Sequence, residues 1–551
     1  MLLRGVICGT AVLALGCSDD ERPIDPGVGG GETTSSAAST GSSVATSSSP
    51  SSSSSGGGVC EPGQVQPCYP GPAEVAGIGT CTVGSETCLP DGSGYAACEG
   101  FVLPSAQQCD SGLDEDCDGF VSSGCSAELT DVVAGLGDAS AQAIAFDAQG
   151  NLLLGITVHG PSFEIAGTTV AVEGFSDALL VKLSPSLDIL WMQSIVGPDG
   201  QSVTDIATDP AGRVAIAGQT VNGIDFGDGL VDSTGVAMYV AVYDPDGALV
   251  FGRADPGYPV PHITMLPAGD VVVGGSFYGD LSFVDGPSWS HNVDDDPFMV
   301  RFDGVTGDLV WAESVGTPFQ ERLHALATTS DGDIVVTAAA WEPNAVVDLG
   351  GGPLSTDDAP IVIARLTPLG EPVWATALGG GAAVLDIGVG PNDDVYVGGG
   401  LYGLTDWGGG PIGGGPNDWQ IVVARFTASG DHVFSRTFGP PSLPDEGMGI
   451  GVDGSGNVVL AGNVVHENGT SLDLGGGLLT TTTDRALFVA KYDETGAHLW
   501  SDTFGFDYAA TVYDVAAAAD GRSALAGGQV GYLDLGTGAL EEGPFVALFA
   551  P

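Results

Sequence analysis

The sequence predicts an all-β protein: a seven-bladed β-propeller of four-stranded antiparallel blades, preceded by a small disulfide-rich module. Three observations support this fold class. The 551 residues include 89 glycines and 34 prolines while 43% are hydrophobic, which favours many short strands and turns over long helices. A repeat of roughly 60 residues fills the C-terminal three quarters of the chain. Eight of the ten cysteines lie together near the N-terminal side of that repeat.

Two landmarks define the repeat. A turn followed by an apolar residue and an aromatic one recurs as Leu190-Trp191, Val250-Phe251, Val310-Trp311, Val373-Trp374, Val433-Phe434 and Leu499-Trp500. A strand that ends in small residues recurs as Leu154-Gly155, Ala217-Gly218, Val273-Gly274, Thr337-Ala338, Val397-Gly398, Ala461-Gly462 and Ala526-Gly527. The second landmark gives seven units.

Each unit is expected to contain four strands. In the sixth unit they cover 449–452, 457–461, 486–492 and 498–503, separated by turns that contain Asp or Gly. Four antiparallel strands in about 60 residues are typical of a propeller blade, whereas a β-helix would show short parallel turns without hairpins. The Asp-x-x-Gly turns, such as Asp244-Pro245-Asp246-Gly247, are interpreted as hairpin tips rather than as metal loops.

The ends of the repeat region predict how it closes. The seventh unit stops after its third strand, at 544–549, and a strand-like stretch at 129–136 stands before the first unit. This stretch is expected to supply the fourth strand of the last blade, which would remove an exposed edge. The propeller domain is therefore predicted over 127–551.

The units resemble the bacterial β-propeller repeat family known by the acronym SBBP. The residues that carry the resemblance are 453–462, DGSGNVVLAG, and 488–492, FVAKY. The resemblance covers about 129–551 and implies the propeller fold, but it implies no ligand.

The first 58 residues predict export and a tether. Arg4, an apolar run and Ala14-Leu15-Gly16-Cys17 form a stretch too short for a permanent membrane span. It resembles a bacterial lipoprotein signal, which implies cleavage after residue 16, lipidation of Cys17 and a membrane anchor. Ser18 resembles the sorting residue of outer-membrane lipoproteins, so a periplasmic or cell-surface location is expected; an ordinary secretory signal cut elsewhere is the alternative. Residues 17–58 are rich in Ser, Thr and Gly and predict a disordered tether.

Eight cysteines define a module at 59–126. They are Cys60, Cys68, Cys81, Cys88, Cys98, Cys109, Cys117 and Cys125. An even number of cysteines in an exported segment predicts four disulfides, whose pairing the sequence leaves open. A zinc site is the alternative, although a repeated CxxC is lacking.

An acidic loop lies inside this module. Asp114, Asp116 and Asp118 alternate before Gly119, as in the first half of a calcium loop. Cys125 stands where an EF-hand needs its last carboxylate, so the loop is not an EF-hand. Residues 109–125 instead resemble a Cys/Asp motif of bacterial surface proteins, which implies binding of calcium or another divalent cation. An acidic turn held only by disulfides is the other interpretation.

Charge is strongly one-sided. The chain has 13 basic and 70 acidic residues, a formal net charge of −57, which excludes nucleic acid as a partner. Five of the basic residues occupy one position of the third strand: Lys182, Arg301, Arg365, Arg425 and Lys491. Repeated positions have repeated surroundings, so each is expected to form an ion pair with an acidic neighbour; recognition of an anionic ligand is the alternative.

The first strand of each unit is expected to line the central channel. Asp205, His262, Asp386 and Asp514 precede its apolar residue in four units, and Ala143, Ala325 and Gly449 do so in the others. If the four polar side chains point inward, they make the channel attractive to cations, whereas a shift of one residue would turn them outward.

The sequence lacks a nucleophile elbow, a phosphate loop and an HExxH motif, and we expect no enzyme. The preferred interpretation is a surface lipoprotein whose propeller binds a protein or glycan partner. Cation binding through Asp114, Asp116 and Asp118 is the alternative, and a propeller enzyme comes third. For glycan binding, the aromatic candidates near the middle connections are Trp289, Trp341, Trp407 and Trp419.

Overall fold

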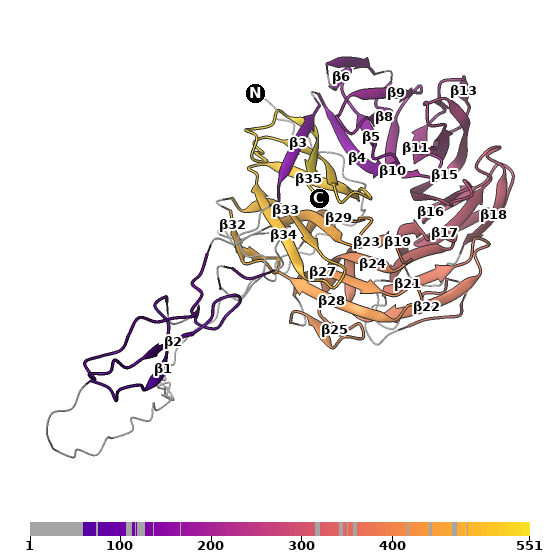
Figure 1. Cartoon of the computed structure of the whole chain (residues 1–551). Coiled ribbons are helices and arrows are strands. Elements are labelled where there is room, and N and C mark those ends of the chain that lie inside the picture. Colours follow the sequence, from indigo (N-terminus) through magenta and orange to yellow (C-terminus); the bar gives the residue numbers. More distant parts are fainter. Residues whose placement is uncertain are drawn as a thin grey trace, which may run out of the picture. The chain divides into compact units, whose positions relative to one another are not determined.

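The computed structural model describes residues 59–551 except 73–74, 106–112, 116, 118–126, 136, 166, 173, 315–319, 341–344, 350, 356–360, 416–417, 440–443, 466–470 and 482. All its named elements are strands (Figure 1). Among the described residues there is no helix with the length and apolar character of a membrane span. Five predicted site residues lie outside the described part of the chain: Cys17, Cys109, Asp116, Asp118 and Cys125.

The cysteine module contains one hairpin and three described disulfides. Strands β1 (Val65–Cys68) and β2 (Gly84–Thr87) pair antiparallel. The disulfides join Cys60 to Cys88, Cys68 to Cys98 and Cys81 to Cys117. The structure thereby gives the pairing that the sequence left open for these six cysteines. In a segment with so few buried apolar side chains, such cross-links restrict the unfolded chain and so stabilise the fold.

Antiparallel sheets make up the rest of the described chain. Unit one contains β4 (Ala139–Phe146), β5 (Leu152–Val158), β8 (Asp177–Leu183) and β9 (Ile189–Ile195). Unit four contains β19 (Glu321–Thr328), β20 (Ile334–Ala340), β21 (Ile361–Leu366) and β22 (Pro372–Leu378). Unit five contains β23 (Gly381–Val389), β24 (Val395–Tyr402), β27 (Trp419–Phe426) and β28 (His432–Phe438). Unit six contains β29 (Pro444–Val452), β30 (Val458–Val465), β33 (Arg485–Tyr492) and β34 (His498–Gly505), close to the predicted ranges.

Units two and three share a strand. Their seven-stranded sheet contains β10 (Gln201–Thr208), β11 (Val214–Val221), β14 (Val236–Tyr243), β15 (Leu249–Met265), β16 (Val271–Ser282), β17 (Ser288–Phe302) and β18 (Leu309–Ser314). The first half of β15 pairs with β14, and its second half pairs with β16. One continuous strand therefore serves as the fourth strand of one unit and the first strand of the next.

Four units carry a small extra hairpin between their second and third strands. These hairpins are β6 (Ser162–Ile165) with β7 (Thr168–Ala171), β12 (Ile224–Asp225) with β13 (Leu230–Val231), β25 (Leu404–Asp406) with β26 (Pro411–Gly413), and β31 (Ser471–Asp473) with β32 (Leu478–Thr480). Their apolar side chains, such as Phe163, Phe226 and Leu472, are buried against the parent sheet. In the sequence these segments read only as glycine-rich connections.

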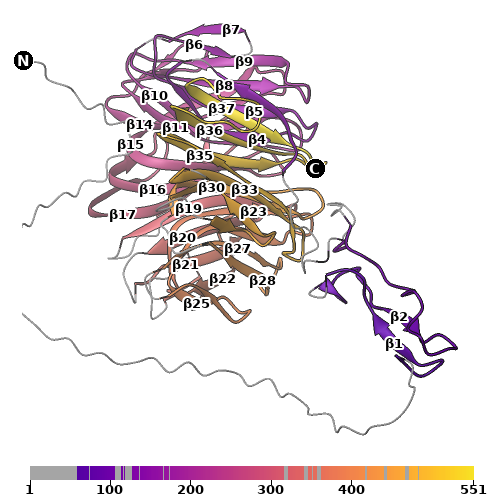
Figure 2. The ribbon, with the colours of Figure 1, turned by 90° about the vertical axis from the view of Figure 1, so that its left-hand side faces the viewer.

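Unit seven combines strands from both ends of the repeat region. It contains β35 (Ala509–Ala517), β36 (Ser523–Val530) and β37 (Gly543–Phe549), and β3 (Leu129–Ala134) pairs antiparallel with β37. Figures 1 and 2 show the last sheet beside the first one, where β35 and β36 lie next to β4. The first strands also lie side by side in sequence order, so that β4 neighbours both β10 and β35. This is a propeller-like arrangement of sheets.

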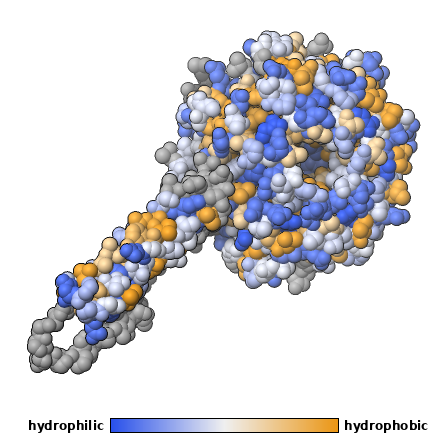
Figure 3. Space-filling view, viewed as in Figure 1, coloured by the Kyte–Doolittle hydropathy of each residue, from blue (hydrophilic) through white to orange (hydrophobic). Residues whose placement is uncertain are grey.

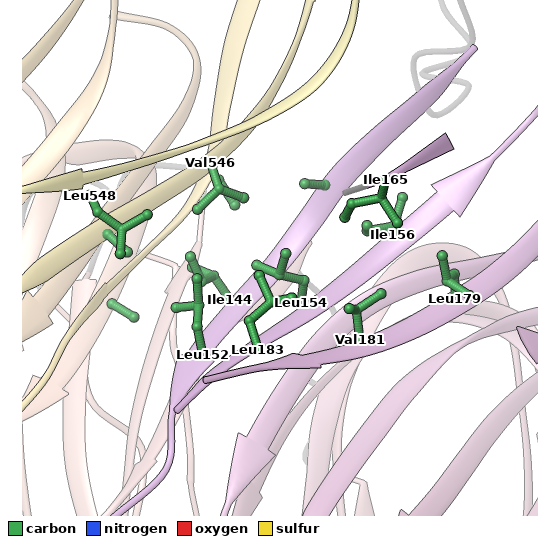
Figure 4. Close-up of a cluster of buried hydrophobic side chains, with 14 of the residues drawn as sticks. Ile144, Leu152, Leu154, Ile156, Ile165, Leu179, Val181, Leu183, Val546 and Leu548 are labelled. Atoms are coloured by element: carbon green, nitrogen blue, oxygen red, sulfur yellow. The ribbon is translucent and has the colours of Figure 1, made fainter. Parts of the chain in front are cut away.

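The hydrophobic core is divided among the contacts between neighbouring units. In one cluster, Leu154 and Val181 of unit one pack with Val546 and Leu548 of unit seven (Figure 4). Other clusters join units one and two, two and three, and so on to six and seven. Each sheet thus buries both faces, which explains why strands such as β8 and β37 are buried along their whole length.

Ion pairs form within five units, as the repeated cations predicted. Lys182 pairs with Asp147 at 2.9 Å, Arg301 with Asp270 at 2.6 Å, Arg365 with Asp333 at 2.8 Å, Arg425 with Asp394 at 2.5 Å, and Lys491 with Asp453 at 3.1 Å. Each aspartate lies at the turn between the first two strands of the same unit. The expected ion pairs are confirmed: the two lysines pair with the first residue of this turn, and the three arginines pair with the residue that ends it.

Each of these cations also donates a hydrogen bond to a backbone carbonyl of the following unit. In units two and seven, where Val242 and Leu548 replace the cation, Arg213 and Arg522 take over this task from the first hairpin. The seven donors, here called the junction cations, and their acceptors are Lys182 to Pro245, Arg213 to Gly304, Arg301 to Pro368, Arg365 to Ala428, Arg425 to Glu494, Lys491 to Gly521 and Arg522 to Gly150. The last contact joins unit seven to unit one.

The recurring tryptophans act at the same junctions. The indole N–H groups of Trp191, Trp311 and Trp374 donate to the carbonyls of Pro245, Pro368 and Ala428, at 2.9, 3.0 and 2.9 Å. A tryptophan and a cation of one unit therefore share an acceptor in the next unit, which gives a structural reason for the aromatic landmark.

The Asp-x-x-Gly turns hold the backbone, as predicted. The Asp244 carboxylate accepts the N–H groups of Asp246 at 3.0 Å and Ala248 at 2.8 Å. Gly247 has a φ of 86°, a left-handed conformation that favours glycine. Within this hairpin the carboxylate oxygen is used for turn geometry.

Candidate functional site

The four predicted channel residues occupy one register position in their sheets. Asp205 lies opposite Ala217, His262 opposite Gly274, Asp386 opposite Gly398 and Asp514 opposite Ala526. They belong to units two, three, five and seven, so the fold places them on four first strands at the same level. Figure 3 shows the surface hollowed near the middle of the sheets, which is where the first strands lie.

Each of the three aspartates joins its own first strand to the first strand of the next unit. One carboxylate oxygen accepts the N–H of the following residue, and the other accepts an N–H across the junction. The three sets are Asp205 with Ile206 at 2.7 Å and Ile263 at 2.9 Å, Asp386 with Ile387 at 2.8 Å and Ile450 at 2.9 Å, and Asp514 with Val515 at 2.7 Å and Ile144 at 2.8 Å. The two N–H groups that each carboxylate binds therefore belong to different units.

The surroundings of two aspartates disfavour their charged form. Burial raises the pKa of Asp386 to about 6, and the negative charge of Asp205 adds to this effect. Burial also raises the pKa of Asp514 well above its ordinary value, with Asp205 and Asp386 contributing. The hydrogen bonds that these carboxylates accept from backbone N–H groups lower the pKa values. Asp205 influences Asp386, and both influence Asp514, so these side chains of three units form one cluster.

Two histidines belong to the same cluster. His262 Nδ1 lies 3.8 Å from an Asp205 carboxylate oxygen. Burial lowers the pKa of His324 to about 4, and the positive charges of His262 and Arg322 contribute. Ala325 occupies the aligned position opposite Thr337, as expected, and His324 lies one residue earlier, in the bulge between Leu323 and Ala325. The first strands of units one, two and seven contain a bulge at the same place.

The cluster can exchange protons and attract positive charge. Within the described ranges, no group of three or more His, Cys, Asp or Glu side chains is arranged to hold a metal ion. The carboxylates are instead occupied by backbone N–H groups, so their first role is to join neighbouring units.

Asp386→Asn is expected to remove part of the pH dependence of stability. Because the folded-state pKa of Asp386 is about 6 against an ordinary 3.8, its contribution to stability grows as the pH falls through 6 and is lost as the pH rises. When the pH falls from 7.5 to 5, the parent should gain about 1 kcal/mol of unfolding free energy relative to the variant. Urea unfolding at both pH values measures this difference.

Comparing the two chains cancels the opposite contribution of His324, whose pKa is lowered. A difference that is constant between pH 7.5 and 5 would contradict the raised pKa of Asp386.

The structure describes only part of the predicted acidic loop. Asp114 is buried, and its carbonyl accepts the backbone N–H of Thr80 at 2.8 Å. Cys117 has a φ of 63° and carries the disulfide to Cys81. Asp116 and Asp118 lie outside the described residues.

The described tryptophans expected in a glycan site are buried or half-buried. Trp407 is buried and donates to the Gly379 carbonyl at 3.1 Å. Trp289 packs on Phe277 and Phe283, and Trp419 packs on Tyr402. Trp341 lies outside the described residues. The contacts of Trp407, Trp289 and Trp419 with their own sheets leave less of each ring for a ligand, and a glycan site at these residues stays a prediction.

Exposed aromatic side chains occur elsewhere. Tyr508 is 70% exposed, Tyr532 49% and Tyr513 42%, all in unit seven. Tyr258 and Tyr278 of unit three are also exposed. Tyr258 and Tyr508 lie at the beginning of a first strand, Tyr278 and Tyr532 lie toward or just after the end of a second strand, and Tyr513 lies in the middle of β35. Sequence reasoning missed them because alternation alone does not tell which tyrosine a neighbouring sheet covers.

Comparison with known proteins identifies no family. No protein-family model and no curated protein matches the chain. Among solved structures, the chain is similar to a protein of unknown function from Dyadobacter fermentans (12% identity, 77% of this chain and 99% of that chain, TM-score 0.36). It is also similar to Kuenenia stuttgartiensis hydrazine synthase (10%, 70% and 92%, 0.33) and to an ulvan lyase (10%, 68% and 95%, 0.34). These neighbours are β-propeller-like proteins, and TM-scores this low carry no argument about activity.

Proposed function

We propose that the chain is a non-enzymatic surface lipoprotein whose propeller binds a protein or glycan partner. In this proposal residues 1–16 are a signal peptide, Cys17 carries the lipid anchor in the outer membrane, and residues 17–58 form a tether. The module of 59–126 contains four disulfides. The three described disulfides support an oxidising compartment.

We further propose that residues 127–551 form a closed propeller of seven blades. The pairing of β3 with β37 supports closure by the strand at 129–136. The contacts of β4 with β35, of Ile144 with Asp514 and of Arg522 with Gly150 support a junction between the last blade and the first. Such a ring presents loops from every blade on two rigid faces.

The exposed tyrosines carry the proposal of a binding surface. Buried sheets hold these rings in place, and tyrosine supplies a large apolar area with a polar end at little entropic cost, which is why it is enriched at interfaces. The binding surface proposed here is therefore formed by the exposed tyrosines of unit seven.

Arrays of immobilised oligosaccharides and peptides test this function with the full chain. We expect the parent to bind some of these ligands. Tyr508→Ala/Tyr532→Ala should bind the same ligands at least tenfold more weakly, because it has lost stacking surface. If every ligand bound both proteins equally, or if the parent bound none, the proposal would fail.

Binding of calcium or another divalent cation by Asp114, Asp116 and Asp118 is the alternative proposal. Of these residues the structure describes only Asp114, which is buried next to the Cys81–Cys117 disulfide.

A further inference from the structure

We propose that a tyrosine patch on unit seven docks a basic polypeptide segment, one rich in arginine or lysine. The patch consists of Tyr508, Tyr513, Val530 and Tyr532. This inference rests on the proposed binding function and specifies the chemistry of the partner.

The four side chains of the patch come from one end of the last sheet. Ala509, next to Tyr508, pairs with Val530, and the N–H of Asp507 donates to the Tyr532 carbonyl at 3.3 Å. A Cβ built on Gly531 would lie 3.0 Å from the Tyr508 Cβ, so the two loops meet closely. The Tyr513 ring lies over Gly528, within 3.5 Å of a Cβ built there. The patch is therefore contiguous across β35 and β36.

The patch rests on a buried base. Ala510, Val512 and Leu533 alternate with the patch residues and are almost completely buried in the core shared by units six and seven. The four patch residues are 42–70% exposed above this base. A surface fixed in this way binds without first having to order its backbone.

The charges around the patch are mainly acidic. Asp507, Glu541 and Glu542 are exposed in the adjoining loops of unit seven. The side-chain amide of Gln529 donates to the carbonyls of Leu540 and Glu541, which ties the acidic loop to the end of β36. Arg485 of unit six, whose carbonyl accepts the N–H of Phe506, is an exposed cation nearby and has its own interaction.

The fold keeps most cations away from this surface. The seven junction cations donate into the following unit, and their ion pairs are mostly buried. With a net charge of −57, the exposed surface repels anions and attracts cations. Tyrosine faces bind guanidinium and ammonium groups, whose charge the neighbouring carboxylates then complement. Aromatic rings beside carboxylates therefore favour a basic segment over a neutral or acidic one.

Fluorescence anisotropy with the full chain and a labelled nine-residue peptide of alternating Arg and Ser tests the inference. We expect Tyr508→Ala/Tyr532→Ala to raise the Kd at least tenfold at 150 mM salt. The matched control is Tyr258→Ala/Tyr278→Ala, which removes two exposed tyrosines of unit three without changing the charge; it should change the Kd less than twofold. Asp507→Asn/Glu541→Gln/Glu542→Gln should also weaken binding about tenfold.

Equal affinity of the parent and both tyrosine variants would overturn the inference, because the net charge alone would then explain binding. Equal losses in the two tyrosine variants would overturn it as well. If the patch variant lost only neutral oligosaccharides on the arrays, the proposed binding function would stand and the basic partner would be wrong. Thermal unfolding of each variant shows that it is folded, and Tyr508→Ser/Tyr532→Ser provides a second patch variant.

Discussion

Replacing Lys491 by methionine is expected to lower the unfolding free energy by about 3 kcal/mol. The Lys491–Asp453 ion pair is 3.1 Å long, and the two side chains are only 2% and 1% exposed. Methionine retains much of the apolar stem but leaves the Asp453 charge buried without its cation. It also removes the hydrogen bond of 2.7 Å to the Gly521 carbonyl of the next unit.

Urea unfolding measures this loss, and Arg322→Met is the matched control. Arg322 pairs with Asp295 at 2.7 Å, but its side chain is 48% exposed, so this pair should contribute less than about 1 kcal/mol. Lys491→Met/Asp453→Asn should recover part of the loss because the uncompensated charge is gone. Similar losses for Lys491→Met and Arg322→Met would show that burial of the pair is not the cause.

Starting the chain at Asp138 instead of Ala127 is expected to destabilise the propeller by about 5 kcal/mol as an upper estimate. The shorter chain lacks β3, so β37 keeps only its pairing with β36 and becomes an exposed edge of the sheet. Leu129, Val132 and Val133, which pack against the core, are removed as well.

Urea unfolding and size-exclusion chromatography of the two chains measure this effect, and the shorter chain should also aggregate. Val133→Asp in the full chain tests the same contact without shortening. If the two shortened chains unfolded at the same urea concentration, β3 would not stabilise the last sheet.

Much of the fold follows from local sequence patterns. The turns and buried strands of unit six are accurate to a few residues because Asp453 and Gly456 fix a hairpin and the flanking strands are continuously apolar. The ion pairs of Lys182 and Lys491 were predictable because repeats place equivalent residues in equivalent surroundings.

Other features depend on contacts between distant segments. Leu249–Met265 contains prolines and glycines that suggest a break, yet the strand continues because β14 and β16 pair with its two halves. His324 lies in a bulge one residue before the aligned position of Ala325, and its place in the cluster depends on the neighbouring strands. The sequence suggests that Trp407 is available to a glycan, but the structure places it in the core beside the hairpin β25–β26. The exposure of Tyr508 likewise depends on which loops meet at the end of the last sheet.

The direction of the junction contacts bears on how many molecules assemble. Each unit offers a cation on one side and carbonyl acceptors on the other, so every contact joins two different surfaces. Contacts of this head-to-tail kind continue until they close into a ring or grow into a filament. An opened chain would leave Arg522 at one end and the Gly150 carbonyl at the other, ready to fit a second opened molecule. The pairing of β3 with β37 and the contact of Arg522 with Gly150 both occur within one molecule, so these surfaces are already occupied.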